Sequence, residues 1–95
     1  MSNTFENPED QKLATLATST LARTGAKQAA ALRDTTGRTY VAINIAAPNL
    51  TLDAVQAVFA VAAASQISGI ESVVFVGESA AETAVITENS PQATI

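Results

Sequence analysis

The sequence predicts a small α/β domain whose elements follow the order helix, strand, strand, helix, strand. An apolar stripe recurs at helical spacing over residues 13–21, and residues 39–45 alternate at the period of a half-buried strand. A second, more apolar helix then leads into a nearly continuous apolar run at residues 70–76. The length of 95 residues allows one domain.

Composition limits both the stability and the chemistry of this chain. It contains no cysteine and no histidine, which excludes a disulfide and any metal site built from thiolate or imidazole ligands. Apolar residues make up 47% of the chain, but they are mostly small, with three phenylalanines and one tyrosine as the aromatic residues. Because alanine buries little area, the core is thin, and association with another chain is its remaining support.

We expect the domain to span residues 7–87, between a flexible N-terminus at residues 1–6 and a loose tail at residues 88–95. The N-terminal residues lack the basic and apolar regions of a signal peptide. The longest apolar run, residues 57–64, is too short to span a bilayer. These observations predict a cytoplasmic protein without membrane contact.

The charge pattern gives little indication of a nucleic-acid partner. The net charge is −4, whereas nucleic-acid binders are normally basic. Four of the five basic residues (Arg23, Lys27, Arg33 and Arg38) fall within one short stretch. We expect them at solvated strand and turn positions, and the alternative is a weak phosphate-facing patch. The two lysines, Lys12 and Lys27, are expected to be exposed and therefore poor catalytic bases.

The first helix is predicted to begin at Asn7 and Pro8 and to end at Gly25. Asn7 is a good N-cap, and proline fits the first helical position. A β-hairpin follows, with arms at residues 29–33 and 38–45 joined by a turn that opens with an aspartate and closes with a glycine. Thr39, Val41, Ile43 and Ile45 share one face of the second arm.

The second helix is the most informative element. Residues 46–49 interrupt the strand, Thr51 can cap the helix, and Leu52–Ser65 then leaves almost no polar face. A helix that is apolar all round must be covered all round. We therefore expect the sheet on one side and a second subunit on the other. The alternative is that the first helix covers the remaining side.

The apolar run at residues 70–76 favours a buried central strand, parallel to the strand before the helix. Such a strand, helix and strand form a right-handed crossover. The segment that follows is ambiguous: residues 80–87 fit a short helix or an edge strand at residues 83–87, and we favour the strand.

The hairpin resembles that of the small cytidine deaminases. That family reads Ala-Ala-Leu, a turn ending in Gly, an aromatic residue and Asn-Val-Glu, and this chain has Ala30-Ala31-Leu32, Gly37, Tyr40 and Asn44 at the same spacing. The resemblance spans residues 10 to 77. It implies a three-layer α/β/α fold with a mixed sheet, shortened at its C-terminus, and a dimer or tetramer with the crossover helix near the subunit contacts.

The catalytic pattern of that family does not carry over. Zinc deaminases place a His or Cys and then a Glu at the start of the crossover helix, and a later Pro-Cys-x-x-Cys completes the metal site. Here Asp53 takes the ligand position and Val55 the Glu position, and no cysteine follows the last strand. These departures from the family's pattern therefore predict no zinc, no other cofactor and no catalytic residue.

A remnant of the substrate pocket is a weaker candidate site. The family's ribose-contacting Asn corresponds to Asn44, and its Glu partner corresponds to Ala46. Asp53 and Glu78 are expected near the same end of the sheet, with Glu82 close by, where α/β folds usually bind ligands. The leading hypothesis is an inactive, homo-oligomeric structural or binding module. The alternatives are a nucleoside or small-metabolite binding protein, and an inactive subunit that completes a site with another protein.

Overall fold

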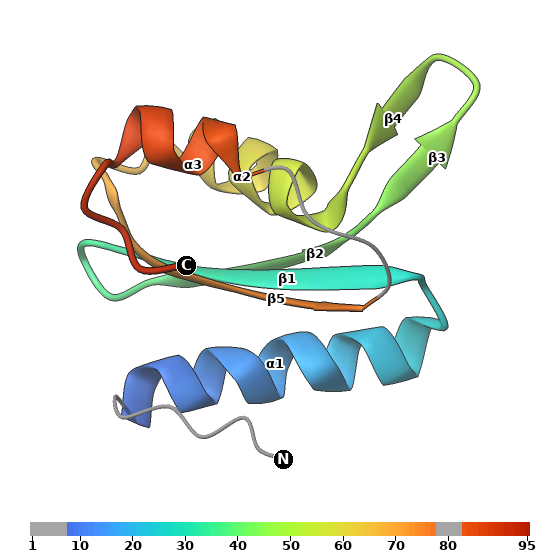
Figure 1. The fold of residues 1–95 in the computed structure, drawn as a ribbon, viewed down its shortest axis with the longest axis horizontal. Helices are drawn as coiled ribbons and strands as arrows, with labels where there is room; N and C mark the ends of the chain where they lie inside the picture. The colour runs from blue at the N-terminus through green and yellow to red at the C-terminus, as the bar shows by residue number, and fades with distance from the viewer. Residues whose placement is uncertain (1–7, 78–82) are drawn as a thin grey trace.

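The computed structural model describes residues 8–77 and 83–95 as three layers (Figure 1). Its elements in chain order are α1 (Pro8–Thr24), β1 (Gln28–Asp34), β2 (Thr39–Ile43), β3 (Ile45–Ala47), β4 (Leu50–Leu52), α2 (Ala54–Ala64), β5 (Ile70–Gly77) and α3 (Ala84–Asn89). Helix α1 covers one face of the sheet β2-β1-β5, and α2 and α3 lie on the other face. The predicted α/β/α architecture is confirmed. Asn7, the predicted N-cap, lies outside the described residues.

Strand β1 is the centre of the sheet, and all seven of its residues are buried. It pairs antiparallel with both β2 and β5. The expectation that residues 70–76 form a central parallel strand is therefore wrong. Strand β5 reads as continuously apolar because helices cover both of its faces, and this pattern does not distinguish a parallel from an antiparallel neighbour. The connection through α2 still joins strands of like direction, with β1 between them.

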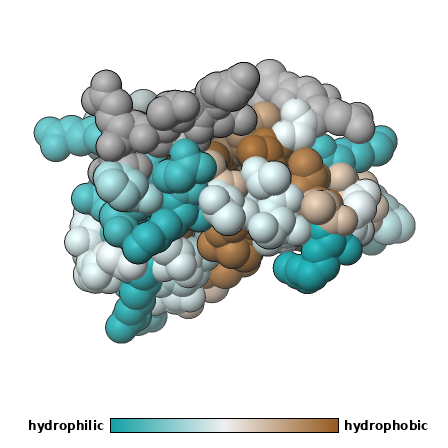
Figure 2. Space-filling view, turned by 90° about the horizontal axis from the view of Figure 1, so that it is seen from below, coloured by the Kyte–Doolittle hydropathy of each residue, from teal (hydrophilic) through white to brown (hydrophobic). Residues whose placement is uncertain are grey.

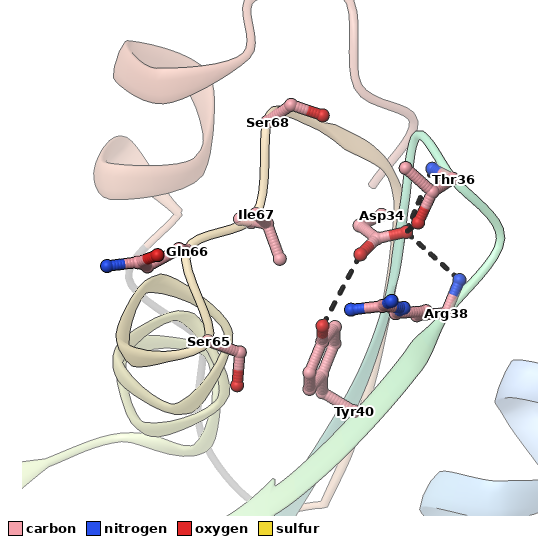
Figure 3. A pocket seen from close by; sticks show the side chains of 8 residues that line it. All are labelled: Asp34, Thr36, Arg38, Tyr40, Ser65, Gln66, Ile67 and Ser68. Carbon is pink, nitrogen blue, oxygen red and sulfur yellow. Dashed lines mark hydrogen bonds between the residues drawn. The ribbon is translucent and has the colours of Figure 1, made fainter.

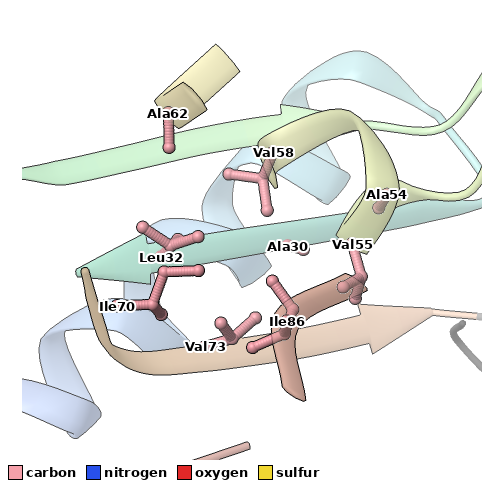
Figure 4. Packing of buried hydrophobic residues seen from close by; sticks show 9 residues of the cluster. All are labelled: Ala30, Leu32, Ala54, Val55, Val58, Ala62, Ile70, Val73 and Ile86. Atoms are coloured by element: carbon pink, nitrogen blue, oxygen red, sulfur yellow. The ribbon is translucent and has the colours of Figure 1, made fainter. Parts of the chain in front are cut away.

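Two small hydrophobic cores lie on either side of β1. The core under α2 joins small and branched side chains (Figure 4): Ala30, Leu32, Ala54, Val55, Val58, Ala62, Ile70, Val73 and Ile86. The core against α1 contains Leu13, Ala14, Ala17, Ala31 and Val74. On the α1 face, hydrophobic side chains show through a largely hydrophilic surface (Figure 2). The alternation of alanines along β1 lets a helix approach the sheet from each side.

The described residues do not cover helix α2 on all sides. Val55, Val58 and Ala62 are fully buried, whereas Ala60 and Val61 are exposed. Because α1 packs on the opposite face of the sheet, the alternative in which it covers the far side of α2 is wrong.

The start of α2 differs from the prediction. The strand was expected to stop at residues 46–49, but Ile45–Ala47 pairs antiparallel with Leu50–Leu52 in a separate hairpin. Thr51 lies within β4, and Asp53 is the N-cap. The helix begins two residues later than predicted because Asp53 can form a capping box with Gln56, three residues on.

The C-terminal segment also differs. Residues 84–89 form helix α3 and not the favoured edge strand, because Ile86 buries fully against the core under α2. Residues 90–95 are not loose: the Val73 N–H donates to the Thr94 carbonyl at 2.8 Å, and Thr94 forms a parallel bridge with Ser72. No helix in the described part of the chain is long and apolar enough to cross a membrane.

Candidate functional site

A shallow cavity of about 210 Å³ lies where β1 and α2 both begin. Its walls come from the β1 entry, the end of β2, the β3–β4 hairpin and the helix cap: Lys27, Gln28, Asn44, Ile45, Ala46, Thr51, Leu52 and Asp53. The structure thus brings Asn44 and Asp53 to one cavity, and their role in ligand binding stays a prediction. Glu78 and Glu82 lie outside the described residues.

Asn44 fixes the entrance of the sheet. Its Oδ1 accepts a hydrogen bond from the Gln28 N–H at 3.0 Å, and its own N–H donates to the Gln28 carbonyl at 3.4 Å. The side chain therefore extends the β1–β2 pairing by one residue after β2 has ended. This use of Asn44 is structural.

Asp53 closes the first turn of α2. Its Oδ1 accepts from the Gln56 N–H at 2.8 Å, and Gln56 Oε1 accepts from the Asp53 N–H at 3.0 Å. This reciprocal capping box satisfies two donors that a helix N-terminus otherwise leaves without an intrahelical partner. The acid expected to bind a ligand is thus engaged with its own backbone.

Gln28 is the residue of this site that the sequence analysis missed. Its side chain is buried beneath the start of α2, and its Oε1 accepts from the Ala54 N–H at 3.1 Å. Together with the capping box, this bond engages a third N–H group at the helix start. A glutamine amid the alanines of a buried strand was the available signal, since buried amides need partners.

The residues at this site do not fit a catalytic zinc ion. The position expected for the proton-shuttling glutamate holds Val55, which is fully buried in the core under α2. The ligand position holds Asp53, whose carboxylate caps the helix. Catalytic zinc sites have three protein ligands, and within residues 8–77 and 83–95 no three Asp or Glu side chains gather.

A second cavity, of about 330 Å³, lies at the opposite end of α2 (Figure 3). Asp34 Oδ1 accepts from the Thr36 N–H and hydroxyl and from the Arg38 N–H, and Tyr40 donates to Oδ2 at 3.4 Å. Burial acts to raise the pKa of Asp34, but these hydrogen bonds outweigh it and hold the pKa below its ordinary value. The carboxylate stabilises the β1–β2 turn.

Arg33 corrects the expectation for the basic stretch. Its side chain is 5% exposed and pairs with Asp10 at 2.8 Å and with Glu71. Burial acts to lower the pKa of Arg33, but the two acids hold it above its ordinary value. Arg33 therefore ties α1 to β5 and does not face solvent or phosphate.

The chain matches the model of one protein family, described as cytidine deaminase-like, over residues 6–95. No curated protein matches the chain. The family match agrees with the helix and strand order and with the hairpin of β1 and β2.

Proposed function

Because the chain belongs to the cytidine deaminase-like family, we propose that it is a non-catalytic member that acts as a self-associating structural or binding module. One observation carries the first part of this proposal. Three N–H groups at the start of α2, those of Asp53, Ala54 and Gln56, are held by the chain's own side chains. In zinc deaminases the metal and the proton-shuttling glutamate belong at this helix start.

The chemistry of deamination supports the same proposal. The reaction needs a metal-activated water and a carboxylate that moves protons to and from the base. Val55 cannot move protons, and a chain without cysteine or histidine lacks the family's usual ligands. A carboxylate that accepts hydrogen bonds from its own helix is also less available to a metal ion.

Self-association is supported by the outer surface of α2. This α2 outer face comprises Ala60, Val61, Ala63 and Ala64, all exposed in the single chain. Val61 is 46% exposed although it lies on α2, the helix that packs over the core under α2. Covering this uncharged face with another copy would add apolar burial that the alanine-rich core lacks.

The test uses the purified full chain, loaded with excess zinc and then desalted. We expect substoichiometric zinc by elemental analysis, no conversion of cytidine to uridine, and a mass above that of the monomer by light scattering. Stoichiometric zinc or turnover would contradict the non-catalytic assignment, and a monomer at all concentrations would contradict self-association.

The same preparation tests the nucleoside-binding alternative. Asn44 and Asp53 line one cavity, but a side-chain oxygen of each accepts a hydrogen bond from a backbone N–H group. We therefore expect no change in melting temperature with cytidine or uridine. A saturable increase would support nucleoside binding in place of a purely structural role. Enzymatic activity that arises only in a complex with a second protein would support the incomplete-subunit alternative. A cytoplasmic location remains a prediction.

A further inference from the structure

The β3–β4 hairpin stands away from the three layers (Figure 1). Its register pairs Ile45 with Leu52 and Ala47 with Leu50, which places these four side chains on one aliphatic face. The hairpin forms its own two-stranded sheet and meets the body chiefly where β4 leads into α2. A two-stranded hairpin is at best marginally stable in water without packing on something else.

The aliphatic face of this hairpin is open to solvent. Ile45 is 37% exposed and Leu50 is 51% exposed. Among the described residues, four large apolar side chains are exposed. They are Ile45 and Leu50 on the hairpin, Val61 on the α2 outer face, and Ile95. Three of the four thus lie on the hairpin or on the α2 outer face.

The distribution of charge favours a second copy as the partner. Residues 39–70 contain one charged residue, the capping Asp53. The chain's five basic residues and its other acidic residues lie outside this stretch. Two copies with a net charge of −4 repel each other, and a contact made through this uncharged stretch adds no close like-charge pair. Three of the four residues of the α2 outer face are exposed alanines. Their small side chains leave room against the helix for the larger Ile45 and Leu50 of a second copy.

One copy cannot join these two surfaces by itself. The hairpin extends from the N-terminal end of α2 and points away from the helix (Figure 1), whereas Val61 lies two turns further along. A two-fold dimer makes the contact twice, once from each hairpin. A standard interface of roughly 800 Å² per partner is about one seventh of the 5614 Å² exposed by the chain.

We propose that the β3–β4 hairpin is an exchanged dimerisation arm whose aliphatic face covers the α2 outer face of a second copy. This inference rests on the self-association in the proposed function and assigns the surfaces that perform it. It gives the hairpin a packing partner beyond the junction with α2 that it has within the described residues of one chain.

Charge substitution on each surface tests the arm. L50K and V61K place lysine at positions exposed in the single chain, so each variant should still fold, and the substitution itself should cost the folded monomer little stability. Each should weaken the dimer by about a hundredfold or more in sedimentation equilibrium, because the introduced charge is buried at the interface. I95K is the matched control, since Ile95 is equally apolar and exposed but lies on neither surface, and it should leave the dimer intact.

Two further variants supply a gain of signal. The double variant L50K/V61E should recover part of the lost affinity, because each contact then pairs opposite charges. The natural chain has no cysteine, so L50C/A64C should form a disulfide-linked dimer under mild oxidation, whereas L50C/I95C should not. If the wild type is a dimer and both L50K and V61K remain dimers of similar affinity, the arm is overturned while self-association is preserved. A monomeric wild type would overturn both, and the zinc and turnover assays test the non-catalytic assignment independently.

Discussion

Gln28 and Asp34 stand at the two ends of β1, and each satisfies backbone groups of a neighbouring element. Gln28 holds the first N–H of α2, and Asp34 holds the N–H groups of Thr36 and Arg38 in the turn that leads to β2. Both side chains are buried, so leaving their partners without an acceptor would be costly. Two polar residues thereby fix where the central strand meets the helix and the turn.

The depressed pKa of Asp34 predicts a specific loss of stability in acid. A carboxylate with a lower pKa in the folded state stabilises the fold above its unfolded pKa, about 3.9, and this contribution is lost as the pH falls through the folded value. We expect the unfolding free energies of wild type and D34N, measured in urea, to differ most above about pH 5, and the difference to shrink as the pH falls below the unfolded pKa.

T36V provides the matched variant for this prediction. It removes the hydroxyl that donates to Asp34 Oδ1 at 2.7 Å, so the pKa of Asp34 should be less depressed, and the loss of stability in acid should be smaller and complete at a higher pH than in wild type. A difference between wild type and D34N that does not change with pH would contradict the assignment.

At the scale of elements, close backbone approach decides how β5 ends. Gly77 has a φ of +124°, and a Cβ built on it would lie 2.3 Å from the Lys27 carbonyl oxygen and 2.8 Å from the Gln28 Cα. The neighbouring atoms belong to the backbone and cannot rotate away. Glycine at this position lets β5 lie against the entry of β1, next to the candidate site.

G77A should therefore destabilise the protein by about 3 kcal/mol or more, combining a steric clash with an unfavourable φ. G37A is the control, because Gly37 also has a positive φ, of +94°, but its added Cβ would meet nothing within 4 Å. The control should cost only about 1 to 2 kcal/mol. Chemical denaturation of both variants gives the comparison, and equal losses would argue against the close approach.

At the scale of the whole molecule, stability is divided between two thin cores on either side of β1. The largest fully buried side chains are leucine, isoleucine and valine, and alanines fill much of the remaining space. Such cores provide modest burial energy, so coverage of the α2 outer face would contribute a sizeable share of the total.

A self-associating fold should melt at a temperature that depends on protein concentration. When the folded dimer dissociates on unfolding, mass action raises the melting temperature as concentration increases. We expect an increase of a few degrees over a hundredfold range of concentration by differential scanning fluorimetry. V61K should show no such dependence, and a wild type that melts at one temperature throughout the range would contradict the expectation.

Much of this fold could be predicted from local patterns. The first helix, the β1–β2 hairpin, the second helix and the apolar strand all occur close to their expected positions. The β3–β4 hairpin was missed because each of its strands has three residues, too few to establish a period of two, and because Pro48 and Asn49 are typical of a strand break. Helix α3 was the less favoured of two alternatives because its few apolar residues fit either a helix or a strand, and burial of Ile86 decides between them.

The position of the candidate site could be predicted from the sequence, but the hydrogen bonds that its residues make could not. Asn44 and Asp53 meet at one cavity, as the order of strand and helix implies. Their hydrogen bonds to Gln28 and Gln56 depend on how β1, β2 and α2 pack. No pattern in the sequence shows which polar side chain a buried N–H group will find.

The sequence by itself determined which metal-ligand types the chain lacks and which family it belongs to. A chain without histidine or cysteine has neither ligand type however it folds, and helices and strands follow from the spacing of neighbouring residues. The tertiary structure decided that β5 pairs antiparallel with β1, that Gln28 lies beneath α2, and that one side of α2 remains exposed. These outcomes depend on contacts between residues far apart in the chain, where packing and hydrogen-bond satisfaction select among arrangements that local periodicity permits equally.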